Sequence, residues 1–174
     1  MTSGVALRRM RWWDVEGVQA LDLELFGSTA WSAAMFWSEL AAGETRWYVI
    51  AETAAGALAG YAGLVVSGSE ADVQTIGVAP AEQGSGVGTL LLRALTTEAV
   101  SRGATSMLLE VRADNEPAIG LYAREGFERI SVRRRYYQPG DVDAWIMRRR
   151  PLESAVPDPE PAPAEPLTAE GRDG

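Results

Sequence analysis

The fold of this chain is decided by the stretch Ile76-Gly77-Val78-Ala79-Pro80-Ala81-Glu82-Gln83-Gly84-Ser85-Gly86-Val87-Gly88. It joins an expected strand, Ala71–Val78, to a long expected helix, Gly86–Arg102, which ends at Gly103. The first turn of a helix presents unpaired N–H groups and a partial positive charge. Glycines let the backbone close around an anion without steric clash. The glycine-rich junction therefore favours a pyrophosphate cradle over an ordinary strand-to-helix turn.

Strand and helix patterns alternate on both sides of this loop. Apolar runs between turn residues predict strands, and apolar residues at helical spacing with caps such as Ser32 predict helices. The expected strands are Val5–Met10, Arg46–Glu52, Ala57–Val66, Ala71–Val78, Ser106–Val111, Phe127–Tyr137 and Asp143–Met147, and the expected helices are Trp12–Phe26, Ser32–Ala42, Gly86–Arg102 and Glu116–Glu125. The order β-α-α-β-β-β-α-β-α-β-β predicts an α/β (α+β) fold with a mixed sheet.

Composition indicates one domain followed by a tail. The chain has 174 residues, of which 47% are hydrophobic, and this is enough for one core. We assign residues 1–150 to the domain, and we expect residues 151–174, rich in Pro, Glu and Ala, to form a disordered tail. The sequence shows no apolar run of about 18 residues and no secretory signal. We therefore expect no membrane partner and take the cytoplasm as the default location.

Three absent residue types restrict the chemistry. The chain contains no Cys, no His and no Lys, and its 16 basic residues are all Arg. A Cys nucleophile, a Ser-His-Asp triad, a Schiff-base lysine and the lysine of a P-loop are therefore excluded. Zinc sites built from Cys or His are excluded as well, and we expect no metal. The remaining general bases are carboxylates, and the remaining weak acids are tyrosines.

The charge of the chain does not favour a nucleic-acid partner. The formal net charge is −8, of which the segment from Pro151 onward carries −5, leaving −3 for residues 1–150. Nucleic-acid binders usually show a basic excess, so we expect no direct nucleic-acid binding. The run Arg133-Arg134-Arg135 is a local exception. It is interpreted equally well as the solvated face of a strand or as a contact for phosphate or an acidic substrate.

The loop pattern distinguishes between classes of cofactor. A dinucleotide-binding fingerprint needs a third glycine where this chain has Thr89, and three expected strands precede the loop, which disfavours a dinucleotide-binding oxidoreductase. The pattern present, Gln-x-x-Gly-x-Gly from Gln83 to Gly88, resembles the coenzyme A pyrophosphate loop of GNAT-superfamily N-acetyltransferases.

Other segments resemble one group within that superfamily, the ribosomal-protein alanine N-acetyltransferases (RimI type). The resemblance runs in the same order over about residues 5–148. Its segments are Phe26 with Ala30-Trp31-Ser32, Leu109-Glu110-Val111-Arg112-Ala113-Asp114-Asn115, Ala118-Ile119-Gly120-Leu121-Tyr122, Glu125-Gly126-Phe127, Arg133-Arg134-Arg135-Tyr136-Tyr137 and Asp143-Ala144-Trp145-Ile146-Met147. Two positions depart from the group: Ala30 replaces a usual Pro, and Gly84 replaces a frequent basic residue.

The resemblance implies acetyl transfer from acetyl-coenzyme A to an amine, with a defined set of site residues. Glu110 would be the general base, directly or through water, and Tyr122 the general acid. Trp31, Tyr136 and Tyr137 would line a peptide groove. The residues implied to hold acetyl-coenzyme A are Ile76, Gly77, Val78, Gln83, Gly84, Ser85, Gly86, Val87, Gly88, Thr89, Asn115 and Tyr122. The implied acceptor is a protein N-terminus, in this group the N-terminal alanine of a small-subunit ribosomal protein.

Each of these residues also has a plain structural interpretation. Tyr122 could simply pack in the core, and Asn115 could simply cap the helix that follows it. Glu110 could form an ordinary ion pair, although a glutamate in the apolar run 107–111 is costly without a purpose. Ionisation equilibria favour one class of acceptor: a protein α-amine has a pKa near about 8, against about 10.4 for lysine, so its deprotonation costs roughly 3 kcal/mol less.

Two other functions remain open on the sequence. A GNAT enzyme acting on a small amine or a lysine would share the fold, the glycine loop and the two catalytic candidates. A non-catalytic acetyl-coenzyme A sensor would need the glycine loop, but it would not need both Glu110 and Tyr122.

Overall fold

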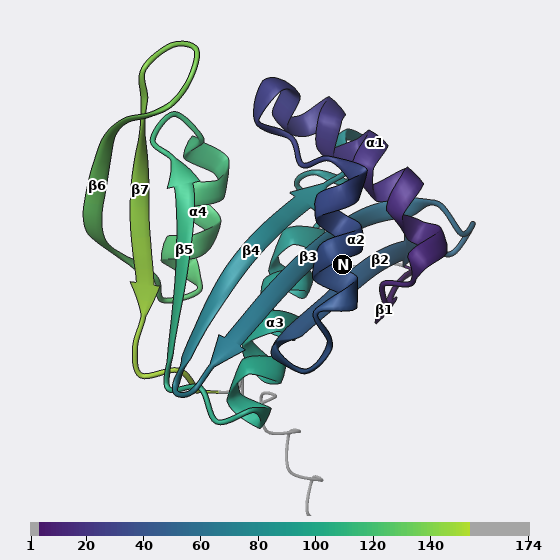
Figure 1. The fold of residues 1–174 in the computed structure, drawn as a ribbon, viewed down its shortest axis with the longest axis horizontal. Coiled ribbons are helices and arrows are strands. Elements are labelled where there is room, and N and C mark those ends of the chain that lie inside the picture. Colours follow the sequence, from purple (N-terminus) through teal and green to yellow (C-terminus); the bar gives the residue numbers. More distant parts are fainter. Residues whose placement is uncertain (1–3, 154–174) are drawn as a thin grey trace, which may run out of the picture.

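The computed structural model describes residues 4–153, which form one mixed sheet with helices on both faces (Figure 1). The strand order is β1-β2-β3-β4-β5-β7-β6. The strands are β1 (Val5–Arg9), β2 (Arg46–Thr53), β3 (Leu58–Ser67), β4 (Glu70–Val78), β5 (Ser106–Arg112), β6 (Glu128–Tyr137) and β7 (Val142–Arg149). The α-helices are α1 (Val15–Phe26), α2 (Ala33–Ala41), α3 (Val87–Ser101) and α4 (Glu116–Arg124). The predicted fold class and the predicted order of elements are confirmed.

The helix ends follow local sequence signals. Ser32 caps α2 by accepting a hydrogen bond from the Met35 N–H at 3.3 Å, and Asn115 caps α4 by accepting one from the Ala118 N–H at 3.2 Å. The predicted start of the first helix, Trp12, was wrong by about one turn. Trp12–Asp14 forms a separate 3-10 turn, and α1 begins at Val15. Helix α4 borders the candidate site described below, and the cap of α2 directly follows Trp31, which lines its smaller cavity.

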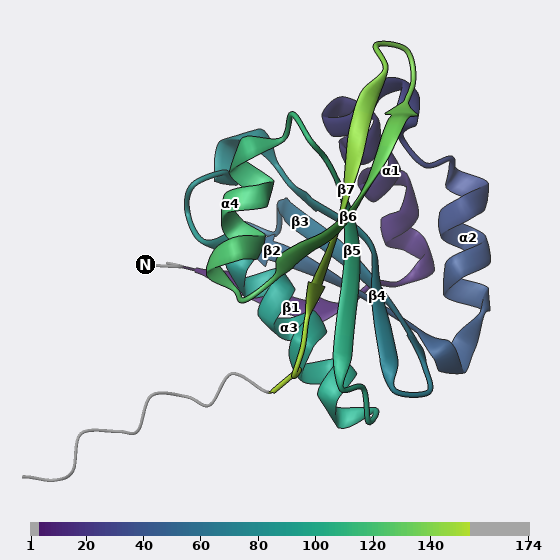
Figure 2. The same ribbon diagram turned by 90° about the vertical axis from the view of Figure 1, so that its left-hand side faces the viewer.

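Two apolar layers hold the helices to the sheet. Successive residues of a strand point to opposite faces, and β2 shows this directly. Val49 and Ala51 pack in the layer under α3, whereas Tyr48 and Ile50 pack in the layer under α1 and α2. Figure 2 shows α3 and α4 on one side of the sheet and α1 and α2 on the other. The sheet core is thus covered on both faces, as the continuous apolar runs of β2 and β3 indicate.

The sheet divides between β4 and β5. These two strands pair in parallel only through Glu70–Asp72 and Ser106–Leu108, after which they diverge (Figure 1). Just beyond the last pair, Gln74 of β4 has no partner on β3, because Leu64 pairs with Val73 and Gly63 pairs with Thr75. Such a bulge bends a strand and increases its twist. The second half of β4 therefore runs away from β5. Of the two cavities described below, both are lined from β4, and the smaller is lined from β5 as well.

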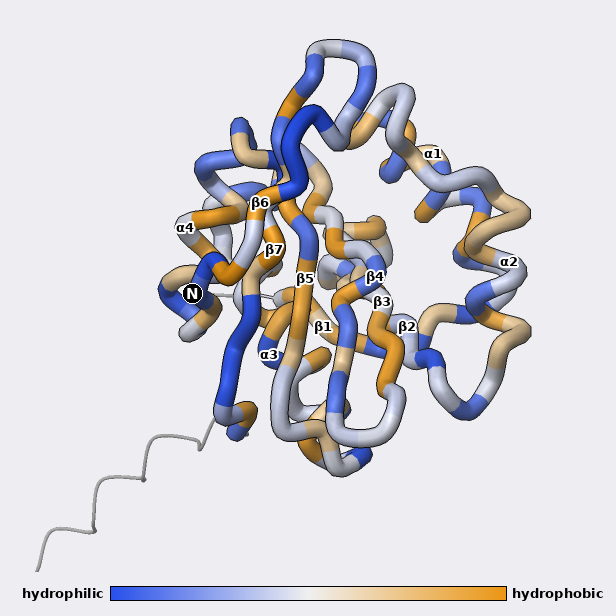
Figure 3. Tube along the Cα trace, turned by 60° about the vertical axis from the view of Figure 1, so that its left-hand side comes forward, coloured by the Kyte–Doolittle hydropathy of each residue, from blue (hydrophilic) through white to orange (hydrophobic). Residues whose placement is uncertain are grey.

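The C-terminal hairpin completes the sheet beside β5. The expected antiparallel pair is present, and β7 lies between β5 and β6, pairing with β5 from Met107 and Arg149 to Arg112 and Ala144. The tube in Figure 3 is orange along much of β5 and blue over part of β6, in keeping with a buried central strand and an exposed edge strand.

Leu152, the second residue of the expected tail, packs with the domain. It is buried in the core layer under α3, and its N–H donates to the Thr105 carbonyl at 2.9 Å. The rest of the proposed tail, from residue 154, lies outside the described residues. Within residues 4–153, no helix has the length and apolar character needed to cross a membrane.

Candidate active site

Two adjoining cavities lie where β4 and β5 diverge. The larger has a volume of about 700 Å³ and the smaller about 200 Å³. Residues from α1, β4 and α4, together with the cap of α4, form walls of both: Phe26, Ile76, Asn115, Ala118 and Tyr122. The two cavities therefore adjoin, and Tyr122 is among the residues that they share.

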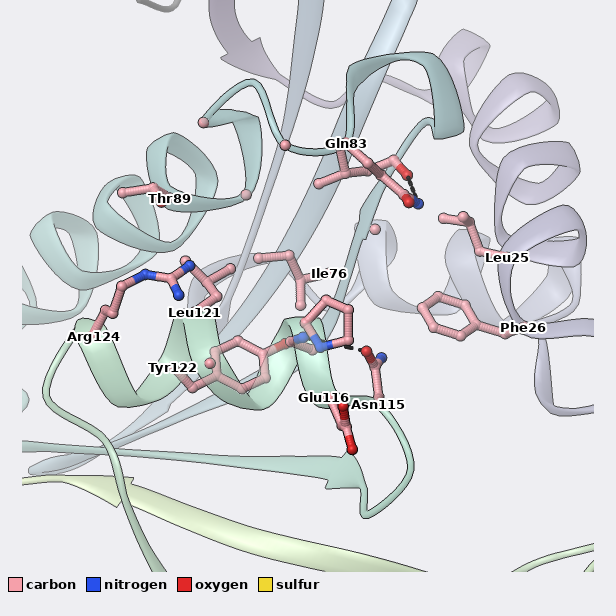
Figure 4. Close-up of a pocket in the computed structure, with 18 residues that line it drawn as sticks. Leu25, Phe26, Ile76, Gln83, Thr89, Asn115, Glu116, Leu121, Tyr122 and Arg124 are labelled. Carbon is pink, nitrogen blue, oxygen red and sulfur yellow. Dashed lines mark hydrogen bonds between the residues drawn. The ribbon is translucent and has the colours of Figure 1, made fainter.

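The larger cavity, shown in Figure 4, contains most of the residues predicted to hold the cofactor. Those that line it are Ile76, Gly77, Val78, Gln83, Gly84, Gly86, Gly88, Thr89, Asn115 and Tyr122. Ser85 and Val87 are not among the lining residues. Val87 is buried in the core beneath α3, and the Ser85 hydroxyl donates to the Glu82 carbonyl at 2.6 Å.

The glycine loop leaves the N-terminus of α3 open towards this cavity. Gly86 is the residue before the helix, with φ of 93°, and no side chain caps the first turn. Gly84 also has a positive φ, 79°. Such backbone conformations strongly favour glycine. The open end of a 15-residue helix offers N–H groups and a partial positive charge to an anion.

The sequence reasoning missed several residues of the larger cavity. Leu25 and Phe26 reach it from the end of α1, opposite the residues of α4 (Figure 4). Arg124, in the last turn of α4, lines the cavity on the side of Thr89. It lies four residues after Gly120, on the same helix face, and this spacing could have identified it. Its guanidinium group places a positive charge in the wall of this cavity.

The diverging edge of β4 is the third feature of the larger cavity. Beyond Asp72, β4 has no pairing with β5, and Ile76, Gly77 and Val78 line the cavity. The Gln83 side-chain amide donates to the Val78 carbonyl at 3.2 Å and so satisfies one backbone group there. Unpaired strand edges bind extended groups through main-chain hydrogen bonds. The edge is therefore suited to an extended amide-containing ligand, such as a pantetheine arm.

The smaller cavity carries carboxylates. Asp22 of α1 and Glu110 of β5 both line it. Glu110 is not embedded in the apolar run as its neighbours suggested: Leu109 and Val111 point into the core, and Glu110 points to the opposite face with 35% of its side chain exposed. The Arg133 guanidinium forms an ion pair with Glu110 at 2.8 Å. One arginine of the basic run thus contacts a candidate catalytic residue.

A cation in the wall of the smaller cavity is already paired. The Arg112 guanidinium binds Asp114 through two hydrogen bonds of 3.0 Å and lies 5.2 Å from the centre of the Tyr137 ring. Burial raises the pKa of Tyr137, and the charge of Glu110 raises it further. Tyr137 therefore lines this cavity as a neutral phenol at physiological pH.

Tyr122 stands at the junction of the two cavities. Its ring is buried, 6.1 Å from the Phe127 ring, so the packing role and the site position coexist. The hydroxyl makes no hydrogen bond to another residue within 4–153, yet its oxygen is not fully enclosed. Burial raises the pKa of Tyr122, with a further contribution from Tyr137. The phenol therefore keeps its proton at physiological pH.

Of the three aromatic residues predicted to contact an acceptor, two line the smaller cavity and one lies outside it. Trp31 and Tyr137 line the smaller cavity. Tyr136 lines neither cavity; it is 48% exposed, with its ring 5.1 Å from the Tyr137 ring and beneath Arg133. Asn115 lines both cavities while also capping α4, so its two interpretations are compatible. No group of three or more Asp or Glu side chains among the described residues could hold a metal ion.

Comparison with known proteins places this arrangement in a family. Residues 9–127 match the acetyltransferase (GNAT) family. The N-alpha-acetyltransferase RimI of Mycobacterium tuberculosis is 42% identical over 141 residues, covering 78% of this chain and 86% of that protein. The ribosomal protein bS18-alanine N-acetyltransferase of Escherichia coli is 42% identical over 94 residues, covering 53% of this chain and 64% of that protein.

A solved structure agrees with these relatives. The crystal structure of the ribosomal-protein-S18-alanine N-acetyltransferase from Escherichia coli superposes with a TM-score of 0.76 at 30% identity, covering 86% of this chain and 95% of that one. The chain belongs to the acetyltransferase (GNAT) family and is an acetyl-transfer enzyme. Its predicted resemblance to the RimI-type enzymes is confirmed.

The geometry of the loop gives a first prediction. Gly86→Ala places a Cβ on a backbone with φ of 93°, which costs about 1–2 kcal/mol in strain. We expect it to weaken acetyl-coenzyme A binding at least about tenfold, as measured by calorimetry, because the end of α3 must shift. Gly43→Ala is the matched control, since Gly43 has φ of 64° and lies outside both cavities. It should lower the melting temperature similarly and leave the dissociation constant unchanged. An unaltered constant for Gly86→Ala would contradict the assignment of the loop.

Proposed function

We propose that this enzyme transfers an acetyl group from acetyl-coenzyme A to the N-terminal α-amine of a protein, in the cytoplasm where new N-termini appear. The observation that carries the proposal is the meeting of two cavities at Tyr122, with the glycine loop in one and Glu110 in the other. The relatives named RimI and bS18-alanine N-acetyltransferase support the N-terminal alanine of a small-subunit ribosomal protein as the acceptor.

The larger cavity fits acetyl-coenzyme A, which supplies an acetyl group activated as a thioester. The N–H groups at the start of α3 and the Arg124 guanidinium would hold phosphate groups. The edge of β4 at Ile76–Val78 would pair with the pantetheine amides and orient the carbonyl to be attacked. Asn115 and Tyr122 would bound the cavity at its reactive end.

The residues of the smaller cavity would move the proton of the acceptor. An amine must lose a proton before or as its nitrogen attacks a carbonyl carbon. The Glu110 carboxylate takes this proton in our proposal, directly or through one water molecule. Arg133 holds that carboxylate in place through their 2.8 Å ion pair. The nearby Asp22 carboxylate adds to a negative environment that attracts a cationic amine.

The Tyr122 hydroxyl would complete the transfer. When the carbon–sulfur bond breaks, the leaving thiolate sulfur takes up a proton. Burial raises the pKa of Tyr122, so the phenol carries its proton at neutral pH and enters the transfer in the form that a general acid needs. Its hydroxyl makes no competing hydrogen bond within residues 4–153.

The size of the smaller cavity favours a small first residue. About 200 Å³ must hold the α-amine and the first side chain. An alanine fits this volume, and its α-amine loses a proton at roughly 3 kcal/mol lower cost than a lysine side chain. Trp31 and Tyr137 would contact the first residues of the acceptor chain.

A peptide panel tests the proposed function by mass spectrometry. We expect acetyl-coenzyme A and the enzyme to add one acetyl group to the free α-amine of peptides that begin with alanine. The matched controls carry a blocked α-amine and one internal lysine, and polyamines form a third set. Acetylation of lysine or polyamines alone would overturn the acceptor assignment while keeping the family chemistry. No acetylation with bound acetyl-coenzyme A would favour a sensor.

Replacement of the proposed base gives a second test. Glu110→Gln keeps the shape of the side chain but cannot take a proton, so we expect turnover to fall about 10²–10⁴-fold. The affinity for acetyl-coenzyme A should stay within about twofold of wild type. Arg133→Gln, which removes the ion-pair partner and leaves the carboxylate in place, should reduce turnover far less. Wild-type turnover in Glu110→Gln would remove this residue as the base.

Replacement of the proposed acid gives a third test. Tyr122→Phe keeps the buried ring against Phe127 and removes a hydroxyl with no protein partner among residues 4–153, so stability should change by less than about 1 kcal/mol. The single-turnover rate should fall at least about 10²-fold, because the leaving thiolate lacks its proton donor. The residual rate should rise when a donor with a more acidic thiol replaces acetyl-coenzyme A. A full wild-type rate would exclude the acid role.

A further inference from the structure

A buried carboxylate to which the proposed mechanism gives no proton-transfer step lies in the wall of the smaller cavity. Asp22, in the middle of α1, is only 1% exposed. Each of its two carboxylate oxygens accepts a hydrogen bond. Oδ2 accepts from the Trp31 N–H at 2.6 Å, and Oδ1 accepts from the Tyr61 hydroxyl. Isolated carboxylates are costly to bury, so both bonds are needed to hold this group inside the protein.

The first bond fixes the turn on the acceptor side. The chain leaves α1 at Phe26, makes the 3-10 turn Gly27–Thr29 and reaches Trp31 just before the cap of α2. Phe26, Thr29 and Trp31 all line the smaller cavity. Asp22 therefore ties the end of this turn back to α1, nine residues earlier. Without that bond, the backbone of Trp31 loses its direct tether to α1.

The second bond reaches the strand on the donor side. Tyr61 of β3 is fully buried, and its ring lies directly under Gly77 of β4, where an added Cβ would be 2.7 Å from the ring atoms. Gly77 lines the larger cavity. Through Tyr61, the Asp22 carboxylate thus joins the acceptor-side turn to the strand that borders the donor cavity. Burial raises the pKa of Asp22, and its two hydrogen bonds oppose this effect.

We propose that Asp22 is a positioning residue that holds the turn Gly27–Trp31 against β3 and so sets the shape of the acceptor cavity. This role rests on the proposed function, because it assigns the smaller cavity to the acceptor. The effect falls on the acceptor and not on acetyl-coenzyme A. Trp31 depends directly on the Asp22 hydrogen bond, whereas the Tyr61 ring under Gly77 is held by its own packing in the layer under α1 and α2.

Two substitutions at Asp22 separate hydrogen bonding from a general loss of packing. Asp22→Ala removes both bonds. Asp22→Asn can restore both, with its Oδ1 accepting from the Trp31 N–H and its Nδ2 donating to the Tyr61 oxygen. We expect Asp22→Ala to raise KM for an alanine-starting peptide at least about tenfold, with the acetyl-coenzyme A dissociation constant within about twofold of wild type. Asp22→Asn should recover KM to within about threefold.

The chain offers a matched control on the neighbouring helix. Glu39 of α2 accepts a hydrogen bond from the hydroxyl of Tyr48, another buried tyrosine, at 2.8 Å, yet neither residue lines a cavity. Glu39→Ala removes a carboxylate–tyrosine bond of the same kind. It should lower the melting temperature and leave the peptide KM unchanged. An equal rise in KM for Glu39→Ala and Asp22→Ala would show a general structural effect and overturn the proposal.

A readout independent of catalysis keeps the two proposals distinguishable. The Trp31 amide should exchange its hydrogen at least about tenfold faster in Asp22→Ala than in wild type, and slowly in Asp22→Asn and Glu39→Ala. Unchanged Trp31 exchange or an unchanged peptide KM in Asp22→Ala overturns the positioning role. If wild-type enzyme acetylates no peptide while Trp31 exchange responds as expected, the tether stands, and the assignment of the cavity to a peptide acceptor fails.

Discussion

The divergence of strands β4 and β5 is the constraint on which the rest of the site depends. Two parallel strands in a covered sheet normally pair along their length, since unpaired backbone groups inside a protein are costly. Here pairing stops at Asp72, and the bulge at Gln74 turns β4 away. The Gln83 side chain satisfies the Val78 carbonyl, and the cavity lies against the remaining edge. The fold thus leaves a strand edge whose main-chain groups can form hydrogen bonds with an extended ligand.

The same divergence of β4 and β5 explains why residues from distant parts of the chain line the same two cavities. Alternation along β5 turns Glu110 away from the core that Leu109 and Val111 help to form. Helix α4 follows β5 after a short turn capped by Asn115, and this places Tyr122 in the walls of both cavities. From the opposite side, the end of α1 contributes Phe26 to both cavities. The site is therefore shaped by backbone divergence, and the side chains occupy positions that the divergence creates.

Local signals in the sequence were sufficient for the elements but not for their pairing. Ser32, Asn115 and the loop glycines act on their own neighbours, so their caps and turns could be predicted. The position of β7 between β5 and β6 depends on contacts between strands far apart in the chain, and nothing local encodes it. The orientation of Glu110 was misjudged because its apolar neighbours suggested burial on both faces. Asp22 was missed for a related reason, since its partner Tyr61 lies 39 residues away.

The two cavities have opposite electrostatic character, and this supports one direction of transfer. The larger holds the start of α3 and Arg124, while its carboxylate, Glu116, points away from the glycine loop in Figure 4. The smaller holds the carboxylates of Asp22 and Glu110. Glu110 is paired with Arg133, and the cation in this wall, Arg112, is paired with Asp114. Under the proposed function, an anionic donor and a cationic acceptor would be drawn to different sides of one wall. Tyr122 belongs to that wall, and burial keeps its phenol neutral, so it would repel neither charge.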